Sequence, residues 1–228
     1  MKLNRFILLL CLGVLARCSK PKCPTPTTPA GTTSSLVLQP DSATGKDATI
    51  FFITSQTTSK GTTNSTNYVY DRDLPAMEWT YQGSPGRKKS LIEFNLSSIP
   101  VTAIIISAKL SLFHSVGSAD GGHNPLSGSN EGVIQRVLSS WDQTTVTWNN
   151  QPAVTDSNKV LIPASTSPTE DYLDIDVKLM VQDMVTNPGT NHGFLLSILN
   201  PVYYRQLIFA SSNHPNAALH PKLVVEYK

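Results

Sequence analysis

The residues whose types and spacing could support chemistry in this 228-residue chain are aromatic side chains beside cationic ones. Trp79 and Tyr81 stand two positions apart, and Tyr203 and Tyr204 directly precede Arg205. A flat aromatic ring can cover the apolar face of a sugar ring. We therefore expect these four aromatic residues to stack on sugar rings, and anchoring of each ring against the fold is the alternative.

Cationic side chains accompany these aromatic residues. Arg87, Lys88 and Lys89 are consecutive, and Arg205 follows the tyrosine pair. Guanidinium and ammonium groups pair with carboxylates, so these four residues could recognise the acidic groups of a polysaccharide such as a uronate polymer. The predicted partner is therefore a polysaccharide, with solvated surface cations as the alternative for 87–89.

We expect both aromatic groups to lie in loops. The first falls in an insertion between Pro75 and Gly83, and the second follows the Asn-Pro phrase at 200–201. An exposed, clustered Trp79 and Tyr81 would favour sugar binding. Their burial would instead favour a structural or adhesive module that makes protein contacts.

Catalysis is not supported by the residue types present. A hydrolase needs a nucleophile beside a base, or two facing carboxylates, and the chain has no Gly-x-Ser-x-Gly phrase. Asp171, Asp174 and Asp176 lie close together, and we interpret them as a solvated face and a helix cap rather than a catalytic or calcium site. The sequence thus predicts a module that performs no reaction, with a polysaccharide-acting enzyme as the alternative.

Metal and nucleic-acid sites are also not indicated. The five histidines form no His-Glu-x-x-His phrase. His114, Asp120 and His123 could meet as a metal site, but a polar surface loop is the simpler interpretation, and calcium in a loop remains an alternative. No cofactor is predicted. A formal net charge of +2, with no basic stripe among aromatic residues, argues against nucleic-acid binding.

The elements that must position these side chains are mainly strands. Hydrophobic residues make up 39% of the chain, enough for a core. Apolar residues recur at every second position in several segments, which indicates strands with one buried face. Many short strands separated by turn signals, such as 83–86 and 120–122, predict an all-β sandwich. The predicted strand segments are 47–52, 92–96, 108–112, 145–148, 194–198 and 223–227.

One short helix is expected to plug an open end of the sandwich. Apolar residues from Val177 to Met184 follow the i, i+3, i+4, i+7 spacing, with Asp176 placed to cap the start and Pro-Gly at 188–189 to end it. Trp141 and Trp148 are interpreted as core residues whose indole N–H groups bond to backbone oxygens. Sugar stacking by either indole is the alternative.

The first 35 residues predict an export signal and a tether. Cationic residues precede an apolar run at 6–16, typical of a signal peptide over residues 1–17. Cys18 ends a Leu-Ala-Arg-Cys phrase that resembles a bacterial lipobox, so we expect its lipidation, with an ordinary signal peptide as the alternative. Residues 18–35, rich in Pro and Thr, predict a tether, and 36–228 a single domain. We therefore expect a lipid-anchored protein at the outer membrane or cell surface, touching the membrane only through its lipid.

Five phrases together carry a family resemblance. They occur in order at 89–100, 106–112, 136–141, 145–152 and 221–227. They resemble the DNRLRE-domain family, which overlaps carbohydrate-binding module family 96 and the disaggregatase-related modules. The resemblance implies an exported, jelly-roll-like β-sandwich, with glycan binding in some members. With the residues above, it predicts a non-catalytic envelope lipoprotein that binds polysaccharide.

Overall fold

The computed structural model describes residues 32–54, 57–58, 61–62, 65–69 and 71–228. The predicted signal peptide, Cys18 and most of the tether lie outside these residues. The described part from Thr32 onward forms one compact unit. Its first strand begins at Ser34, inside the segment expected to be tether. No helix in the described part of the chain combines the length and apolar character needed to cross a bilayer.

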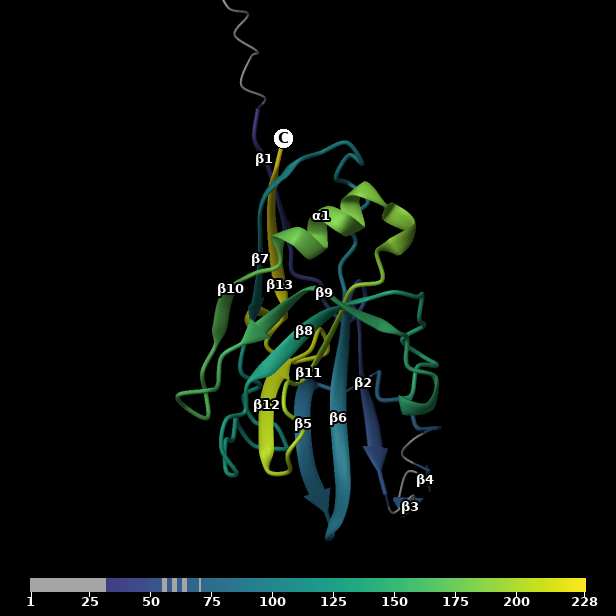
Figure 1. Ribbon diagram of the computed structural model, residues 1–228, viewed down its shortest axis with the longest axis vertical. Helices are drawn as coiled ribbons and strands as arrows, with labels where there is room; N and C mark the ends of the chain where they lie inside the picture. The colour runs from purple at the N-terminus through teal and green to yellow at the C-terminus, as the bar shows by residue number, and fades with distance from the viewer. Residues whose placement is uncertain (1–31, 55–56, 59–60, 63–64, 70) are drawn as a thin grey trace, which may run out of the picture. The chain divides into compact units, whose positions relative to one another are not determined.

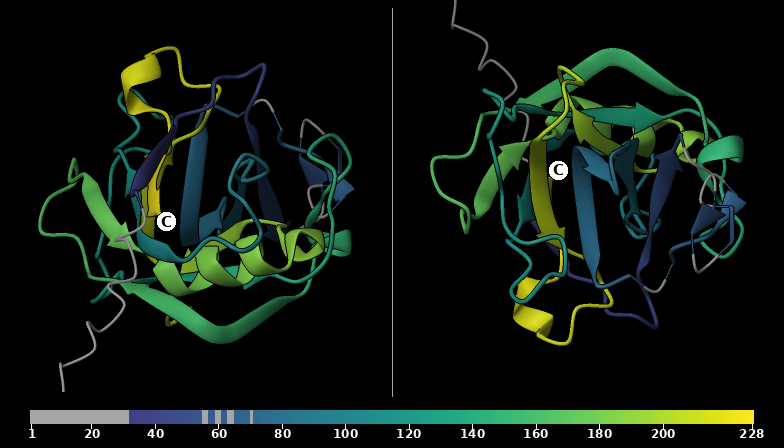
Figure 2. Two further views of the ribbon diagram at one scale, coloured as in Figure 1. Left: turned by 90° about the horizontal axis from the view of Figure 1, so that it is seen from above. Right: turned by 90° about the horizontal axis from the view of Figure 1, so that it is seen from below.

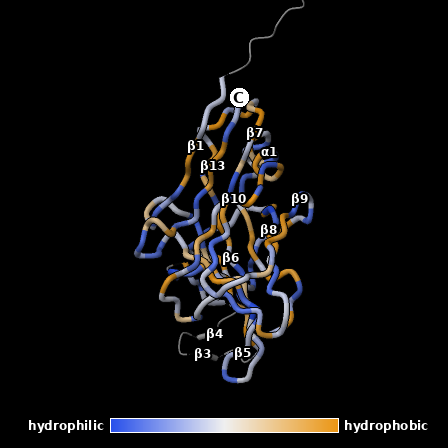
Figure 3. The backbone as a smooth tube through the Cα atoms, turned by 90° about the vertical axis from the view of Figure 1, so that its left-hand side faces the viewer, coloured by the Kyte–Doolittle hydropathy of each residue, from blue (hydrophilic) through white to orange (hydrophobic). Residues whose placement is uncertain are grey.

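Two antiparallel sheets form the sandwich (Figure 1), and β3 (Thr57–Thr58) pairs separately with β4 (Gly61–Thr62). The predicted all-β sandwich is confirmed. Figure 3 shows hydrophobic stretches interleaved with hydrophilic ones along the sheets, as the alternation in the sequence predicts. The small sheet has the order β1 (Ser34–Leu38), β13 (Lys222–Tyr227), β7 (Ile105–Leu112), β10 (Tyr172–Asp176). The large sheet has the order β12 (Arg205–Ala210), β5 (Asp73–Tyr81), β6 (Ser84–Glu93), β11 (Phe194–Ile198), β8 (Gly132–Val137), β9 (Val154–Ile162), and β2 (Lys46–Ile53) also pairs with β6.

Strand β6 organises the large sheet because it has three partners. Its residues 84–88 pair with β5, and residues 90–92 pair with β11. Strand β2 pairs with residues 86–93, so it occupies the opposite edge. Strands β5 and β11 therefore pair with the same edge of β6, β5 along its first half and β11 along its second half. Strand β12 continues the sheet beyond β5, and β8 and β9 continue it beyond β11.

The main core lies between the two sheets and is closed at one end by α1 (Lys178–Thr186), the predicted helix (Figure 2). Met180, Val181 and Met184 are buried, as their spacing predicts. The N-cap position is Val177, one residue after the predicted Asp176, whose carboxylate nevertheless accepts a hydrogen bond from the Lys178 amide at 3.0 Å. The shorter elements are β3 (Thr57–Thr58), β4 (Gly61–Thr62) and the 3₁₀ turns η2 (Trp148–Asn150), η3 (Pro188–Thr190) and η4 (Ala217–Leu219).

Three strand and turn predictions are wrong. The segment 92–96 is strand only as far as Glu93, where β6 ends, because the Asn95 side chain accepts the Ser97 amide hydrogen bond at 3.0 Å and turns the chain. The segment 145–148 is no strand, because the Asn150 side chain accepts the Thr147 amide hydrogen bond at 2.6 Å and fixes a turn before η2. The turn expected over 83–86 lies one residue earlier, at Gln82 and Gly83, whose φ angles are 51° and 81°. Positive φ at both positions suits a tight hairpin, and β6 has already begun at Ser84.

Candidate functional site

The predicted site residues around the first aromatic pair lie in strands, not in a loop. Residues 78–81 belong to β5, and 87–89 belong to β6. Consecutive strand side chains point to opposite faces. The three cations are therefore divided, with Arg87 and Lys89 on one face of the β5–β6 hairpin and Lys88 on the other.

A groove of about 460 Å³, which we name the hairpin groove, lies on the Lys88 side of the hairpin. Trp79 and Tyr81 both line it, together with the facing loop 119–124. The predicted pair is thus brought together, partly exposed, on one side of β5. The remaining lining residues are Met77, Thr80, Gln82, Pro168 and Gln206.

Other aromatic rings hold this pair in place. The ring centroids of Trp79 and Tyr204 are 5.2 Å apart, with the planes at 88°. Tyr81 meets Phe51 edge to face at 4.8 Å. A Cβ at Gly86 would lie 2.6 Å from the Tyr81 ring, so this ring lies against the backbone of β6 where only glycine leaves room.

Lys88 supports the hairpin groove from below instead of facing a ligand. Its Nζ lies 2.5 Å from Asp120, and 5.3 and 5.5 Å from the ring centroids of Phe51 and Tyr81. Burial by itself lowers the pKa of Lys88, but the Tyr81 and Asp120 oxygens more than offset it and hold the pKa above its ordinary value. The ammonium therefore fastens the Asp120 loop to β6.

A second groove, of about 350 Å³, crosses the other face of the large sheet, and we name it the sheet-face groove. Arg87 and Lys89 line it, as does Glu78, which is buried. Burial raises the pKa of Glu78, with Arg87 and Lys89 opposing the rise. The Arg87 Nε lies 3.0 Å from the Glu78 carboxylate. The other lining residues are Val133, Gln135, Trp148, Asp156, Lys159, Ser197, Ile198, Leu199 and Pro201.

The two indoles of the family phrases have different environments. Trp141 is 8% exposed and its Nε1 donates to the His192 oxygen at 2.9 Å, which confirms its core assignment. Trp148 is only half-buried, so its core assignment is wrong. Its ring lies 5.4 Å from that of Phe52, and the Lys89 Nζ is 4.8 Å from its centroid.

Sequence reasoning missed the contribution of β8 and β9 to the sheet-face groove. Gln135 donates from Nε2 to Asp156 at 2.8 Å, and Asp156 lies 3.3 Å from Lys159. The sequence carries no periodic signal at this strand, because β8 reads Gly-Val-Ile-Gln-Arg-Val and its polar and apolar residues do not alternate. The pairing of β8 with β11, 60 residues or so away in sequence, was not visible.

The second predicted cluster contributes to neither groove directly. Arg205 donates from Nε to the Ser127 hydroxyl at 3.2 Å and from Nη2 to the Ser127 carbonyl at 3.1 Å. Ser127 in turn donates to the Tyr203 carbonyl. Arg205 therefore fixes a loop, and Tyr204, 40% exposed, supports Trp79.

The histidine and aspartate groups have structural partners. His123 is buried, and its Nδ1 accepts from the Ile208 amide at 2.9 Å. The His114 ring is 5.5 Å from it, whereas Asp120 is bonded to Lys88. Asp171 accepts the His114 amide at 2.8 Å. Within the described ranges, no three His, Cys, Asp or Glu side chains are grouped to hold a metal ion.

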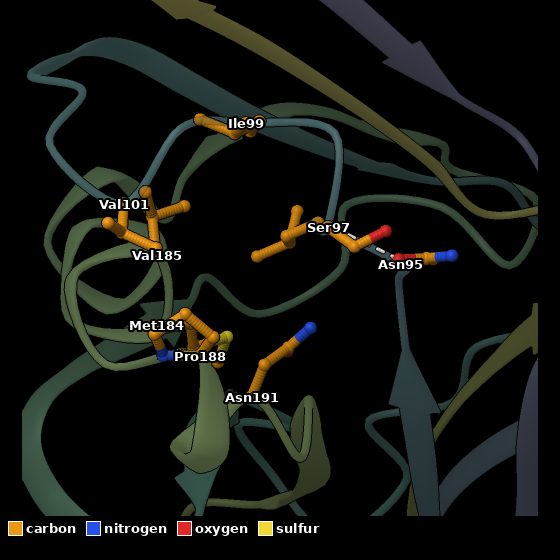
Figure 4. A pocket seen from close by; sticks show the side chains of 9 residues that line it. Asn95, Ser97, Ile99, Val101, Met184, Val185, Pro188 and Asn191 are labelled. Carbon is orange, nitrogen blue, oxygen red and sulfur yellow. Dashed lines mark hydrogen bonds between the residues drawn. The ribbon is translucent and has the colours of Figure 1, made fainter.

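A third cavity, of about 300 Å³, lies between the loop after β6 and the end of α1 (Figure 4). Asn95 accepts the Ser97 amide at 3.0 Å, and Asn191 donates to the Phe94 carbonyl at 2.9 Å. The lining has no aromatic ring to cover a sugar. Its apolar residues are Leu96, Ile99, Val101, Met184, Val185 and Pro188.

Comparison with known proteins adds a family to this geometry. Residues 27–227 match the family model described as Carbohydrate-binding module family 96. The match includes both grooves and all strands of the two sheets. The comparison with curated proteins found no match.

Proposed function

The chain belongs to carbohydrate-binding module family 96, and from this premise we propose that it binds a polysaccharide bearing carboxylates through the sheet-face groove. Three cations line this groove, Arg87, Lys89 and Lys159, against the two carboxylates Glu78 and Asp156. The balance is one positive charge. Such a surplus favours an anionic ligand.

The environment of the Lys89 ammonium is the observation that carries the proposal. Its Nζ lies 3.3 Å from the Gln151 amide oxygen and faces the Trp148 ring. No carboxylate of the described chain lies within ion-pair distance of it, whereas Arg87 and Lys159 each have one. A uronate carboxylate at Lys89 would form the missing charge-assisted pair. The Gln135 and Ser197 side chains are placed to bond sugar hydroxyls.

Replacing Lys89 with glutamine should weaken binding to polygalacturonate about tenfold, which is roughly 1.4 kcal/mol. The loss is expected because the variant removes the cation that, among the described lining residues, has no carboxylate within ion-pair distance. Affinity electrophoresis in gels containing polygalacturonate measures the effect. Raised salt should narrow the difference between wild type and variant, since screening weakens a charge pair.

The matched control is Lys228→Gln, which removes the same charge from an exposed residue that lines neither groove. Equal affinities for Lys89→Gln and Lys228→Gln would overturn the proposal, and Lys89→Arg should retain binding. We further infer that the module is non-catalytic, because the Glu78 and Asp156 carboxylates are paired with Arg87 and Lys159. Release of reducing ends from the same polymer by the wild-type chain would contradict this.

We also propose that Cys18 is lipidated after export and anchors the protein at the outer membrane or cell surface. The lipobox-like phrase before Cys18 supports this. Strand β1 begins at the end of the domain opposite the β5–β6 hairpin (Figure 1).

Metabolic labelling with an alkyne-tagged fatty acid tests the anchor. The wild-type chain should take up the label, and Cys18→Ser should lose it completely because the acyl acceptor is gone. Cys23→Ser is the matched control and should keep the label. Labelling that survives Cys18→Ser would refute lipidation at this residue.

A further inference from the structure

The two grooves lie on opposite faces of one hairpin. Along β5, Glu78 lines the sheet-face groove, while its neighbour Trp79 lines the hairpin groove. Along β6, Arg87 and Lys89 line the first, and Lys88 supports the second. We propose that the hairpin groove is a second, separate saccharide site and that it binds an uncharged sugar residue.

The aromatic surface of this groove is fixed in advance. Trp79 and Tyr81 come from alternate positions of one strand, so they face the same side. Each is supported by a further ring, Tyr204 for Trp79 and Phe51 for Tyr81. Rings already held in place lose little conformational entropy when a ligand stacks on them.

The facing wall supplies polar groups. The Gln206 Nε2 donates to the carbonyls of Asp120 and Gly122, both at 2.8 Å, and so fixes loop 119–124 against β12. The backbone of Asn124 also pairs with Gln206. Gln82 and Asn124 are among the lining residues, and their amide groups suit sugar hydroxyls.

The charges distinguish this groove from the sheet-face groove. No lysine or arginine is among the described residues that line it. Its carboxylate, Asp120, is neutralised by the supporting Lys88. Burial lowers the pKa of the lining His123, which keeps this ring uncharged near neutral pH. A carboxylated sugar would find no cation here, whereas a neutral sugar needs none.

Because the two grooves lie on opposite faces of the hairpin, each groove would bind its own ligand. A single sugar ring cannot fill both grooves, because the β5–β6 hairpin separates them. The domain could therefore hold two polymer strands, or two stretches of one strand, and simultaneous engagement raises the apparent affinity through effective concentration. The hairpin-groove proposal does not depend on the acidic ligand proposed for the other face.

Isothermal titration calorimetry of the full chain with cellohexaose, xylohexaose and mannohexaose measures binding at the second site. The wild type should bind at least one of these neutral hexasaccharides. Trp79→Ala should weaken that binding about tenfold or more, while polygalacturonate binding stays within about twofold, because Trp79 lines the hairpin groove and not the sheet-face groove. The matched control is Trp148→Ala on the other face, which should leave hexasaccharide binding unchanged.

Hydrogen exchange on the wild type removes any dependence on the folding of a variant. The bound hexasaccharide should slow exchange in 80–83 and 119–124 but not in 154–160. The proposal is overturned if none of the three neutral sugars binds, if protection appears only at 154–160, or if Trp79→Ala and Lys89→Gln lower every affinity in parallel. A different outcome would contradict only the acidic site. In that case Trp79→Ala alone loses neutral binding, and Lys89→Gln binds polygalacturonate as tightly as the wild type.

Discussion

Replacing Trp141 with alanine is expected to lower the free energy of unfolding by about 3–5 kcal/mol. The indole is 8% exposed, and truncation would leave a cavity and strand the His192 carbonyl that now accepts its N–H. The Lys46 ammonium also lies 4.7 Å from the ring centroid. Trp141 belongs to a second apolar cluster with Ala48, Ile50, Leu91, Val137, Val146 and Leu195.

This cluster joins segment 139–153 to the large sheet, so its loss should reach the sheet-face groove. Trp148 packs against it, and a loosened segment would no longer hold that indole beside Lys89. Urea unfolding followed by circular dichroism measures the stability, and polygalacturonate affinity measures the groove.

Trp141→Phe is the control for the ring itself. It keeps most of the apolar volume and removes the N–H, so the expected cost is about 1–2 kcal/mol. Losses below 1 kcal/mol for the alanine variant, or equal losses for both variants, would show that the indole does not hold this segment down.

The strands and the helix could be predicted where burial is one-sided. Segments such as 108–112 and 223–227 alternate because one face meets the core, and Met180 and Met184 repeat at the spacing of a buried helical stripe. Strand β5 was mistaken for a loop for the converse reason. Leu74 and Ala76 face the core while Met77 and Trp79 cover the other side, so both faces are apolar and no period of two appears.

The candidate site was harder to predict because it depends on the face of the sheet to which each side chain points and on the pairing of strands that lie far apart in the sequence. Arg87, Lys88 and Lys89 are all expected to recognise acidic groups, but they lie in a strand, and its alternation divides Lys88 from Arg87 and Lys89. Trp148 became a groove residue because side-chain hydrogen bonds around Asn150 replaced the expected strand with a 3₁₀ turn. The partners from β8, β9 and loop 119–124 come from segments far away in the chain.

Replacing Asp120 with alanine is expected to destabilise the fold by about 2–3 kcal/mol, because it leaves the Lys88 ammonium largely buried without its carboxylate. The side chains are 13% exposed for Lys88 and 20% for Asp120, which places the expected cost below that of a fully enclosed pair. The variant should also weaken neutral hexasaccharide binding, because Asp120 lies in the loop that forms one wall of the hairpin groove.

A double variant distinguishes the cost of leaving Lys88 unpaired from the cost of altering the loop that contains Asp120. If the cost arises from the stranded ammonium, Lys88→Met in the Asp120→Ala background should recover more than about 1 kcal/mol, since the buried charge is gone. Asp156→Ala is the matched control: its pair with Lys159 is exposed on both sides, so the expected change is within about 0.5 kcal/mol. Chemical denaturation at neutral pH measures all four proteins. If Asp120→Ala proved no more harmful than Asp156→Ala, the Lys88–Asp120 pair would not be what fastens the groove wall to β6, and the preformed shape argued for this site would need another cause.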